Sequence, residues 1–509
     1  MPAVKTPRPL KSTEINGTPD TVRALVHPPG WRNPDPAARY DLVVLGGGTA
    51  GLVSAMGAAG LGARVALVER HLLGGDCLNT GCVPSKAILR SARVAGELRQ
   101  AAGLGVSVKG VEIDFERVMG RMRARRAAIA VHDSAERLRR AGVDVFFGSG
   151  MFEDGQTVRV GESRLRFRRA VIATGSRPAA PSIPGLEGVS YLTNETIFGL
   201  TTLPRRLLIL GAGPIGCELA QAFARFGSSV TVLDHSPEVL SREDPDASAV
   251  VRRSLERDGV RFELALRPER VDGSSAEVTI TGAREPDGQS VTCAGEALLV
   301  AAGRTPNIED LHLEAAGVRS TSQGVVVSDR LQTTNPRVYA SGDVCSAYKF
   351  THAADAMSRL VLRNALFFGR HKASKLVIPW VTYTDPELAH VGVTQADVAE
   401  SDGRLATITI DLSEVDRAVV DDQTDGFVRV HHEGGRLRGC TIVAPHAGEM
   451  IAEAVYALTH RGSLADLAAT VHPYPTQTEA LRKAGDVYRR QSLTPRVRRW
   501  FERYFRWTR

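Results

Sequence analysis

Leu42-Val43-Val44-Leu45-Gly46-Gly47-Gly48-Thr49-Ala50-Gly51 is an apolar run that leads into a GxGxxG pattern. The run predicts a buried strand, and the small residues after it predict a helix. The pattern glycines Gly46, Gly48 and Gly51 let backbone N–H groups approach a pyrophosphate at the start of that helix. A second strand is predicted at residues 63–68, and Glu69 at its end is placed to bind a ribose hydroxyl pair. The stretch therefore predicts a βαβ dinucleotide-binding unit in an α/β fold.

The same pattern occurs a second time further along the chain. Residues 207–210 form its apolar run, and Asp234 ends the second predicted strand; the pattern glycines are Gly211, Gly213 and Gly216. An acid in the place of Asp234 accepts the 2′-hydroxyl of NAD and repels the 2′-phosphate of NADP. His235 and Arg242 follow it, and both suit a phosphate. We therefore expect NADH as the favoured electron donor, with NADPH as the alternative.

Two cysteines lie between the two glycine patterns. Cys77 and Cys82 are five positions apart, where a glycine-rich loop runs into an apolar helical pattern. A bend at residues 79–81 can bring their Cα atoms within the ~4.4–6.8 Å that a disulfide requires. Thiols at a helix N-terminus face the positive end of the helix dipole, which favours the thiolate. A redox-active pair between two dinucleotide sites implies an enzyme that passes electrons from nicotinamide through flavin to the disulfide.

Two further segments, residues 173–178 and 338–343, complete a family resemblance. Together with the motifs above, they resemble the pyridine nucleotide–disulfide oxidoreductases over roughly residues 39–490. The resemblance implies FAD, together with NADH or NADPH, as cofactors. The cofactor-binding candidates that it adds are Thr174, Gly175, Gly303, Gly342 and Asp343, the last at the ribityl–phosphate region of the flavin.

The resemblance also assigns roles around the cysteine pair. Cys82 is the sulfur nearest the flavin and forms the charge-transfer thiolate, whereas Cys77 is the interchange thiol exposed to substrate. Lys86 lies one helical turn beyond Cys82 and can point at the flavin. Glu218 matches the family's acid that pairs with this lysine. A charged lysine there stabilises the negative charge that develops on the reduced flavin. Lys86 is therefore expected to serve both catalysis and cofactor binding.

Length and pattern divide the chain into several parts. The 509 residues, 43% of them apolar, can bury a large core and form about three domains. Residues 407–410 and 426–430 alternate like strands of an antiparallel sheet, which resembles the family's C-terminal interface domain. We therefore expect two Rossmann-like domains plus a C-terminal α+β domain, in a homodimer whose partner subunit completes each active site. The expected parts are a disordered leader at 1–38, an FAD-binding domain at 39–190 and 306–377, an NAD(P)-binding domain at 191–305, a dimerisation domain at 378–488 and a basic tail at 489–509.

The electron acceptor depends on the run His472-Pro473-Tyr474-Pro475-Thr476-Gln477-Thr478-Glu479. Family members that act on glutathione or lipoamide have a catalytic histidine in a His-Pro-Thr…Glu pattern. Here Tyr474 aligns with that histidine and Glu479 with the glutamate. A tyrosine there resembles mercuric reductase and favours a soft metal ion as the acceptor. Mercuric reductase also carries a C-terminal vicinal cysteine pair, and here no cysteine follows Cys440.

Two other functions stay open. One is a dihydrolipoamide-dehydrogenase-type reaction on a small thiol or disulfide, for which His472 is the base if its ring turns into the site. The other is electron donation to a membrane partner protein. That idea comes from residues 489–509, which hold eight arginines and one acid, so that their charge of +7 equals the formal net charge of the chain.

The tail also shows helical amphipathicity. Pro495 can open a helix, and the apolar residues that share one face are Val497, Trp500, Phe501, Tyr504 and Phe505. Such a helix suits an anionic membrane surface, with packing on the dimer as the alternative. The rest of the chain has no basic module, so nucleic acid is not an expected partner.

Composition also excludes some classes of protein. No run of 18 apolar residues is present, so no transmembrane helix is predicted. The first 38 residues hold eight prolines and no apolar stretch of the signal-peptide kind. The four cysteines outside the pair are scattered without CxxC spacing. This usage suits a cytoplasmic protein and indicates no resident metal site.

Overall fold

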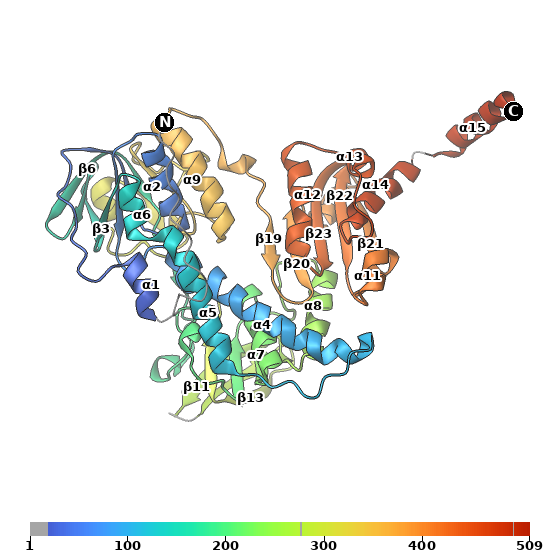
Figure 1. Cartoon of the computed structure of the whole chain (residues 1–509), viewed down its shortest axis with the longest axis horizontal. Helices are drawn as coiled ribbons and strands as arrows, with labels where there is room; N and C mark the ends of the chain where they lie inside the picture. The colour runs from blue at the N-terminus through green and yellow to red at the C-terminus, as the bar shows by residue number, and fades with distance from the viewer. Residues whose placement is uncertain (1–18, 275–276, 492) are drawn as a thin grey trace.

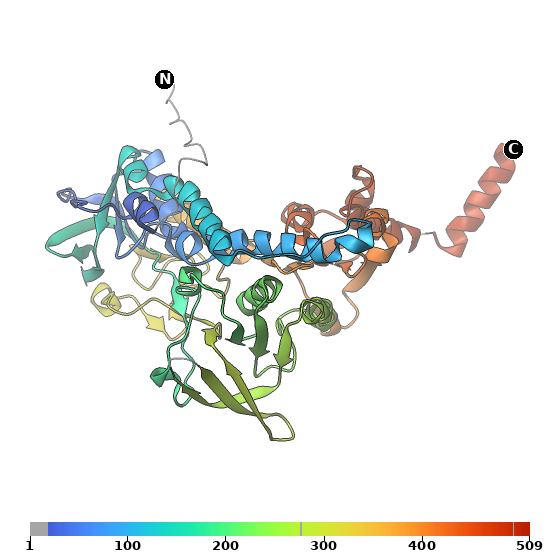
Figure 2. The ribbon, with the colours of Figure 1, turned by 60° about the horizontal axis from the view of Figure 1, so that its bottom comes forward.

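The computed structural model describes residues 19–274, 277–491 and 493–509. It forms three units, each built around its own β-sheet (Figure 1). The N-terminal unit and the C-terminal unit lie at the left and the right of Figure 1, and a long helix, α4 (Cys82–Gln100), runs from the first toward the second below them. The second unit lies below both of them (Figure 2). The two dinucleotide-type units and the separate C-terminal α+β unit agree with the predicted α/β fold class.

The first unit has a seven-stranded sheet of order β3-β2-β1-β6-β5-β4, with β18 paired to β6. Alternate residues of β1 face opposite sides, so Leu42 and Val44 pack on helices α2 and α9, while Val43 and Leu45 pack on the β4–β5 side. Both faces are covered, which explains why the paired stretches of β1 and β2, residues 42–45 and 65–68, are wholly apolar. The strands are β1 (Tyr40–Leu45), β2 (Val65–Glu69), β3 (Val143–Phe147), β4 (Gly150–Asp154), β5 (Thr157–Val160), β6 (Ser163–Ile172) and β18 (Val338–Ala340). The helices are α2 (Thr49–Gly60), α3 (Gly75–Asn79), α5 (Phe115–Ala130), α6 (Ala135–Arg140) and α9 (Thr351–Leu366).

The second unit repeats the βαβ arrangement. Its parallel sheet has the order β10-β9-β8-β14, and a three-stranded antiparallel sheet, β11-β12-β13, lies beside it. Helix α7 (Pro214–Phe226) is buried over most of its length, because it packs on the sheet and also on α4. The strands are β8 (Arg206–Leu210), β9 (Ser229–Leu233), β10 (Arg261–Glu263), β11 (Leu266–Gly273), β12 (Val278–Arg284), β13 (Gln289–Gly295) and β14 (Ala297–Val300); the other helix is α8 (Pro245–Arg257).

The C-terminal unit has a five-stranded antiparallel sheet of order β19-β20-β23-β22-β21. Alternating apolar residues of its strands pack against helices α12, α13 and α14. The strand predictions are confirmed for 407–410 and for 427–430, which fall in β21 and β22; these two strands pair with each other, and Gly426 lies just before β22. The strands are β19 (Trp380–Thr382), β20 (Glu387–Gly392), β21 (Ala406–Asp411), β22 (Phe427–Glu433) and β23 (Arg436–Ala444). The helices are α10 (Gln395–Ala399), α11 (Asp416–Val420), α12 (Ala447–Thr459), α13 (Leu464–Ala469), α14 (Glu479–Gln491) and α15 (Pro495–Thr508).

The predicted disordered leader is wrong for the part of it that the structure describes; residues 1–18 lie outside the described residues. Helix α1 (Pro19–Val26) packs on the first unit and buries Val22 and Val26 almost completely. These two residues, with Leu25 between them, have the spacing of an amphipathic helix. The many prolines outweighed this short pattern in the sequence-based prediction.

The chain after α1 is also ordered, by contacts with β3. Trp31 Nε1 donates a hydrogen bond to the Val145 carbonyl oxygen (3.2 Å). The Asn33 side chain accepts from the Phe147 N–H (2.8 Å) and donates to the carbonyl oxygen of the same residue (2.9 Å). Residues 31–33 therefore belong to the fold of the first unit.

The boundary predicted between the dimerisation domain and the tail also differs in the structure. Helix α14 continues through residue 489 to Gln491, so the first residues of the predicted tail belong to that helix. The separate tail helix, α15, begins at Pro495 as the sequence predicts.

Candidate active site

The first glycine loop connects β1 to α2. Gly48 precedes helix α2 and provides no side-chain cap, so the first N–H groups of the helix are open to an anionic ligand. A Cβ on Gly51 would lie 1.7 Å from the Gly46 carbonyl oxygen, so only glycine lets the helix pack this closely on the strand end. Glu69 Oε2 accepts a hydrogen bond from the Gly47 N–H (2.6 Å). The loop and this carboxylate fit the pyrophosphate and ribose of a dinucleotide such as FAD.

The second glycine loop, between β8 and α7, has the same geometry. Gly213 precedes α7 and provides no side-chain cap, and a Cβ on Gly216 would lie 1.9 Å from the Gly211 carbonyl oxygen. Asp234 Oδ2 accepts from the Ala212 N–H (2.6 Å), as Glu69 does in the first loop. Both dinucleotide patterns predicted from the sequence therefore form complete loops of the same construction.

The cysteine pair lies at the junction of two helices. Cys77 is in α3 and Cys82 is the first residue of α4, where the helix dipole favours a negative charge. Asp76 holds the bend between them, because its Oδ1 accepts from Thr80 Oγ1 (2.5 Å) and from Asn194 Nδ2 (3.0 Å). Both cysteines are free thiols. Cys77 is less accessible than Cys82, which differs from the exposed position predicted for Cys77.

The two thiols have opposite acidities. The hydrogen bond from Cys77 lowers the pKa of Cys82, and although burial raises it, contacts with Thr351 and the charge of Lys86 bring it down to about 6. The pKa of Cys77 is raised, first by the same hydrogen bond and then by burial. At neutral pH the reduced pair therefore holds its negative charge on Cys82, while Cys77 keeps its proton.

Lys86 forms an ion pair with Glu218 close to the thiols. Lys86 Nζ lies 2.8 Å from Glu218 Oε2, and the Glu218 side chain is 6% exposed. Burial lowers the pKa of Lys86, but the charge and hydrogen bond of Glu218 outweigh this and raise it overall. Tyr383 completes the group, because its N–H donates to Glu218 Oε1 (2.9 Å) and its ring lies 4.5 Å from Lys86 Nζ. The ammonium group is therefore held charged and in one position.

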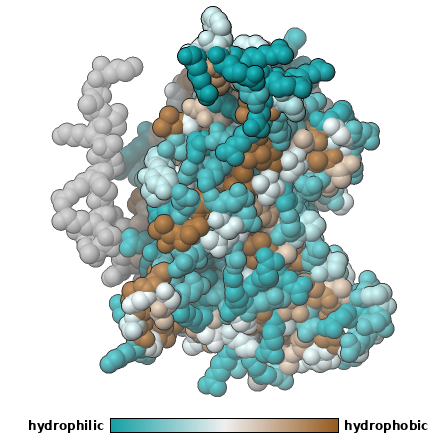
Figure 3. Space-filling model, turned by 90° about the vertical axis from the view of Figure 1, so that its right-hand side faces the viewer, coloured by the Kyte–Doolittle hydropathy of each residue, from teal (hydrophilic) through white to brown (hydrophobic). Residues whose placement is uncertain are grey.

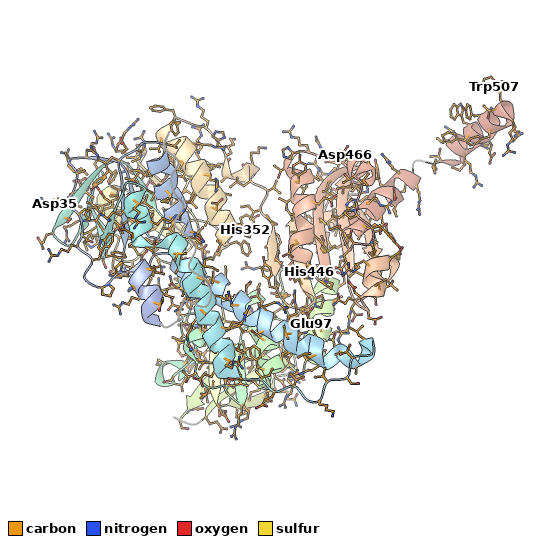
Figure 4. The ribbon with its side chains drawn as sticks, viewed as in Figure 1. Asp35, Glu97, His352, His446, Asp466 and Trp507 are labelled. Carbon is orange, nitrogen blue, oxygen red and sulfur yellow. The ribbon has the colours of Figure 1, made fainter. Side chains whose placement is uncertain are left out.

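Helix α9 also points its N-terminus at the thiols. Thr351, the first residue of α9, places its Oγ1 3.4 Å from Cys82 Sγ. The next residue, His352, bonds through Nε2 to the Pro379 carbonyl oxygen (2.6 Å) and is labelled at the start of α9 in Figure 4. Helix N-termini α4 and α9 thus converge on Cys82, and both favour the thiolate.

A small two-stranded sheet gathers the other predicted cofactor residues. It pairs β7 (Ser176–Pro178) with β15 (Arg304–Pro306), so that residues 174–175, 303 and 342–343 come close together. Ser176 Oγ donates to Asp343 Oδ2 (2.6 Å) and accepts from Arg304 Nε (2.8 Å). Arg304 also lies 2.7 Å from Asp76 Oδ2. Arg304 therefore links the flavin-type motif at 342–343 to the bend of the cysteine pair.

Tyr474 and Glu479 lie in the C-terminal unit, away from the cysteine pair of the same chain. Tyr474 is 72% exposed, and its hydroxyl donates to Asp416 Oδ2 (3.0 Å), which raises the pKa of the phenol. Glu479 is buried at the start of α14, and its Oε1 accepts from Arg482 (2.5 Å). Among the described residues of a single chain, neither contacts Cys77 or Cys82. A role at the thiols therefore requires the Tyr474 of a second subunit.

His472 has a different environment from Tyr474. Its side chain is 5% exposed, and Nε2 lies 2.9 Å from Glu453 Oε2. Its Nδ1 lies 3.1 Å from the Thr470 carbonyl oxygen, so both ring nitrogens have partners inside the subunit.

Four residues around the thiols were missed by the sequence analysis: Asp76, Arg304, Thr351 and Tyr383. Thr351 is 269 positions from Cys82. No local spacing connects residues so far apart; Asp76 and Arg304 are, however, direct neighbours of Cys77 and Gly303, which the sequence did single out.

Comparison with known proteins agrees with this geometry. The chain matches the family model "Pyridine nucleotide-disulphide oxidoreductase" over residues 40–358 and the dimerisation domain of the same family over residues 378–485. A mercuric reductase of Streptomyces lividans is 36% identical over 460 residues, which cover 88% of this chain and 96% of the relative. A dihydrolipoyl dehydrogenase of Bacillus subtilis is 33% identical over 468 residues, covering 88% of this chain and 98% of the relative.

A solved structure has the same fold. The Cu(II) complex of the HOCl-induced flavoprotein disulfide reductase RclA from Escherichia coli superposes with a TM-score of 0.77 at 27% identity, covering 89% of this chain and all of that one. Both family models match, and the relatives align with most of the chain, so the family can be assigned. The chain belongs to the pyridine nucleotide-disulphide oxidoreductases, whose members use FAD and NAD(P)H and carry a dimerisation domain.

Proposed function

We propose that this oxidoreductase passes a hydride from NADH through FAD to the Cys77–Cys82 pair, and from there two electrons to a soft metal ion such as Hg(II). In the net reaction NADH loses two electrons and a proton, and Hg(II) takes up the two electrons. The observation that carries the proposal is the free thiol pair at the start of α4, where the pKa of Cys82 is lowered to about 6, together with an exposed tyrosine, Tyr474, at the position of the family's catalytic histidine.

The cofactor sites follow from the two glycine loops. We propose that FAD lies along the first loop and that the nicotinamide cofactor lies along the second. Bound FAD supplies a two-electron carrier between the nicotinamide and the sulfurs. The proposed FAD contacts are Gly46, Gly48, Gly51, Glu69, Lys86, Thr174, Gly175, Gly303, Gly342 and Asp343, and the proposed nicotinamide-cofactor contacts are Gly211, Gly213, Gly216 and Asp234.

In the proposed reaction, neighbouring groups of the chain stabilise two charges, the Lys86 ammonium and the Cys82 thiolate. Glu218 keeps the Lys86 ammonium protonated and fixed close to Cys82. There it stabilises negative charge during hydride and electron transfer. The N-termini of α4 and α9 and the Thr351 hydroxyl stabilise the Cys82 thiolate.

The proposed acceptor follows from what Tyr474 can and cannot do. A dithiol substrate needs a base that titrates near neutral pH, whereas the phenol has its pKa raised above the usual value by Asp416. A soft metal ion needs thiolates and a donor oxygen rather than a proton shuttle. We propose that the partner subunit presents its exposed Tyr474 to a metal ion held by the two sulfurs, with Glu479 fixing the start of α14 beneath it. Relatives named mercuric reductase support this choice.

A dihydrolipoamide-type activity is the second candidate, because one extensive relative carries the name dihydrolipoyl dehydrogenase. The contacts of His472 disfavour it. A histidine with both nitrogens engaged inside its own subunit cannot exchange a proton with a substrate unless it leaves Glu453. Electron donation to a membrane partner is a third candidate, and the tail described below is its only support.

The acceptor is tested by the rate of NADH oxidation with Hg(II) as its bis-thiolate complex, Cu(II), lipoamide, glutathione disulfide and oxygen. We expect Hg(II) to be the fastest acceptor and lipoamide to be slower by about 10²-fold, because no base serves the dithiol. Tyr474→Phe is expected to slow Hg(II) reduction and leave the residual lipoamide rate unchanged.

The matched control is His472→Ala. It is expected to leave the Hg(II) rate unaltered, and the retained flavin absorbance shows that the variant is folded. Fast lipoamide turnover that disappears in His472→Ala would assign the base to His472 and contradict the soft-metal proposal.

Asp234 is proposed to select NADH. Its Oδ1 accepts from the Ser236 N–H (2.8 Å) and its Oδ2 from the Ala212 N–H, so the carboxylate is fixed where a 2′-phosphate would lie. The neighbouring His235 is 87% exposed, and its Nδ1 lies 3.1 Å from Asp234 Oδ1. We expect kcat/KM to be at least about tenfold higher for NADH than for NADPH, a difference of about 1.4 kcal/mol. Asp234→Ser is expected to reduce this ratio, and a tenfold preference for NADPH in the unaltered protein would overturn the assignment.

A further inference from the structure

The C-terminal helix α15 has two chemically distinct faces. Its start is fixed locally, because Pro495 occupies the first turn and Thr494 Oγ1 accepts from the Val497 N–H (3.3 Å). At 100° per residue the apolar side chains fall on one side of the helix and every charged side chain falls on the other. The apolar face consists of Val497, Trp500, Phe501, Tyr504, Phe505 and Trp507. The charged face consists of Arg496, Arg498, Arg499, Glu502, Arg503, Arg506 and Arg509.

The aromatic rings of α15 form one continuous surface. The Trp500 and Tyr504 rings are stacked with centroids 6.0 Å apart, and Phe501 contacts Trp500 edge-on at 5.1 Å. Phe505 joins them through Tyr504 at 5.6 Å. The rings therefore pack on one another along the helix rather than on the rest of the protein.

This surface is exposed in the single chain. No residue of α15 is buried, and Trp500 and Trp507 are 62% and 83% exposed. The helix stands away from the C-terminal unit (Figure 1), with Trp507 labelled near its outer end (Figure 4). Figure 3 views the molecule from the end that carries α15 and shows hydrophobic groups exposed among hydrophilic ones. An aromatic face of this kind in water indicates a binding surface.

We propose that α15 binds the surface of an anionic lipid bilayer and lies in its interface. The charge of the helix is complementary to such a surface, since residues 495–509 contain six arginines and a single acid. No helix in the described part of the chain combines the length and apolar character needed to cross a bilayer, so α15 lies in the interface without spanning it.

The residue types favour a lipid surface over other occupants. Trp and Tyr have amphipathic rings that settle at the level of lipid headgroups, and arginine side chains on the opposite face can reach the phosphates. A coiled-coil partner helix would be matched by Leu, Ile or Val at the apolar positions, but five of these six positions in α15 are aromatic. A nucleic-acid duplex would be held through its phosphates by the arginines and would leave the aromatic face in water.

The test is co-sedimentation of the full FAD-containing chain with two kinds of vesicle. One kind is pure phosphatidylcholine, and the other has phosphatidylcholine and phosphatidylglycerol in equal parts. We expect strong binding to the anionic vesicles and little binding to the neutral ones. A chain that ends at Gln491 is expected to lose the binding and to keep NADH-dependent dye reduction, because α15 lies outside the proposed active site.

Two substitution sets separate the contributions of the faces. Replacing Arg498, Arg499 and Arg506 by glutamine is expected to weaken binding by about a hundredfold. Replacing Trp500, Phe501 and Phe505 by serine is expected to weaken it at least about tenfold without a change of charge. A charge-matched control replaces the exposed Arg117, Arg139 and Arg140 on α5 and α6 by glutamine, and it is expected to bind as the unaltered chain does.

Three results would overturn the proposal. The first is equal vesicle binding by the full chain and the chain that ends at Gln491. The second is an oligomer that forms in the absence of lipid and dissociates when the chain is truncated at Gln491 or carries the aromatic substitutions. The apolar face of α15 would then bind a second copy of the chain. The third is binding to duplex DNA that exceeds binding to anionic vesicles and is unaffected by the aromatic set, which would assign the helix to nucleic acid.

Discussion

Replacing Cys82 by serine is expected to abolish the long-wavelength absorbance of the two-electron-reduced protein and to reduce acceptor turnover below detection. The absorbance requires a thiolate next to oxidised flavin, and the thiolate is expected on Cys82, whose pKa lies near 6. A serine hydroxyl does not ionise at these pH values. Electron flow from NADH to an artificial dye is expected to persist, because hydride transfer to the flavin requires neither sulfur. Absorbance spectra during anaerobic titration with dithionite, together with dye reduction, measure both effects.

The pH dependence of this band follows from the lowered pKa. The thiolate is present above the pKa and is protonated below it, so the band of the reduced protein is expected to grow with rising pH, with half of its amplitude near pH 6. The hydrogen bond from Cys77 is the largest cause of the low pKa. Cys77→Ser, which keeps a hydroxyl donor, is therefore expected to show the band without any reductant. Cys77→Ala is expected to show it with a midpoint at higher pH. A band that survives in Cys82→Ser would mean that the roles of the two sulfurs are reversed.

Replacing Arg225 by methionine is expected to cause the largest loss of stability. Arg225 is 3% exposed, and its guanidinium lies 2.8 Å from Asp258 and 2.9 Å from Asp385. Asp258 follows α8 in the second unit, whereas Asp385 belongs to the turn before β20, so this one side chain joins two units. Removal of the cation leaves two carboxylates unpaired at a cost of about 3–5 kcal/mol. The expected result is a thermal midpoint several degrees lower, measured by the release of flavin fluorescence.

An exposed ion pair in the same unit is the matched control. Arg206 and Glu277 are 2.8 Å apart and each is nearly half exposed, so Arg206→Met is expected to change stability by about 0.5 kcal/mol or less. Equal midpoints for Arg225→Met and the unaltered protein would show that Arg225 does not join the two units energetically.

The sequence predicted the parts of the fold that follow from local pattern. The two βαβ units and the β21–β22 pair each rest on apolar periodicity and glycines within a short window. Helix α1 was missed because its two buried valines lie among prolines, and composition is a poor guide over eight residues. The end of α14 was misplaced because the charge pattern of the tail begins inside the helix, and charge does not mark a helix end.

In the candidate active site, too, the sequence predicted local relationships but not contacts between residues that are far apart in the chain. The spacing of Cys82 and Lys86 is local, since one helical turn separates them. The pairing of Lys86 with Glu218 was inferred from the family resemblance, because the two residues lie in different units. Thr351 and Arg304 could not be inferred, since their positions depend on how α9 and β15 pack after folding. The contact of Tyr474 with Asp416 likewise links positions 58 apart.

The bonds from residues 31–33 have a consequence for the association of chains. Strand β3 is the last strand of its sheet, and it pairs with β2 on one side alone. A free outer strand offers its backbone groups to any other chain that can add a strand. Trp31 and Asn33 occupy such groups at Val145 and Phe147. The segment before β1 thus closes an open edge, and a chain that begins at residue 39 would expose a template for edge-to-edge aggregation.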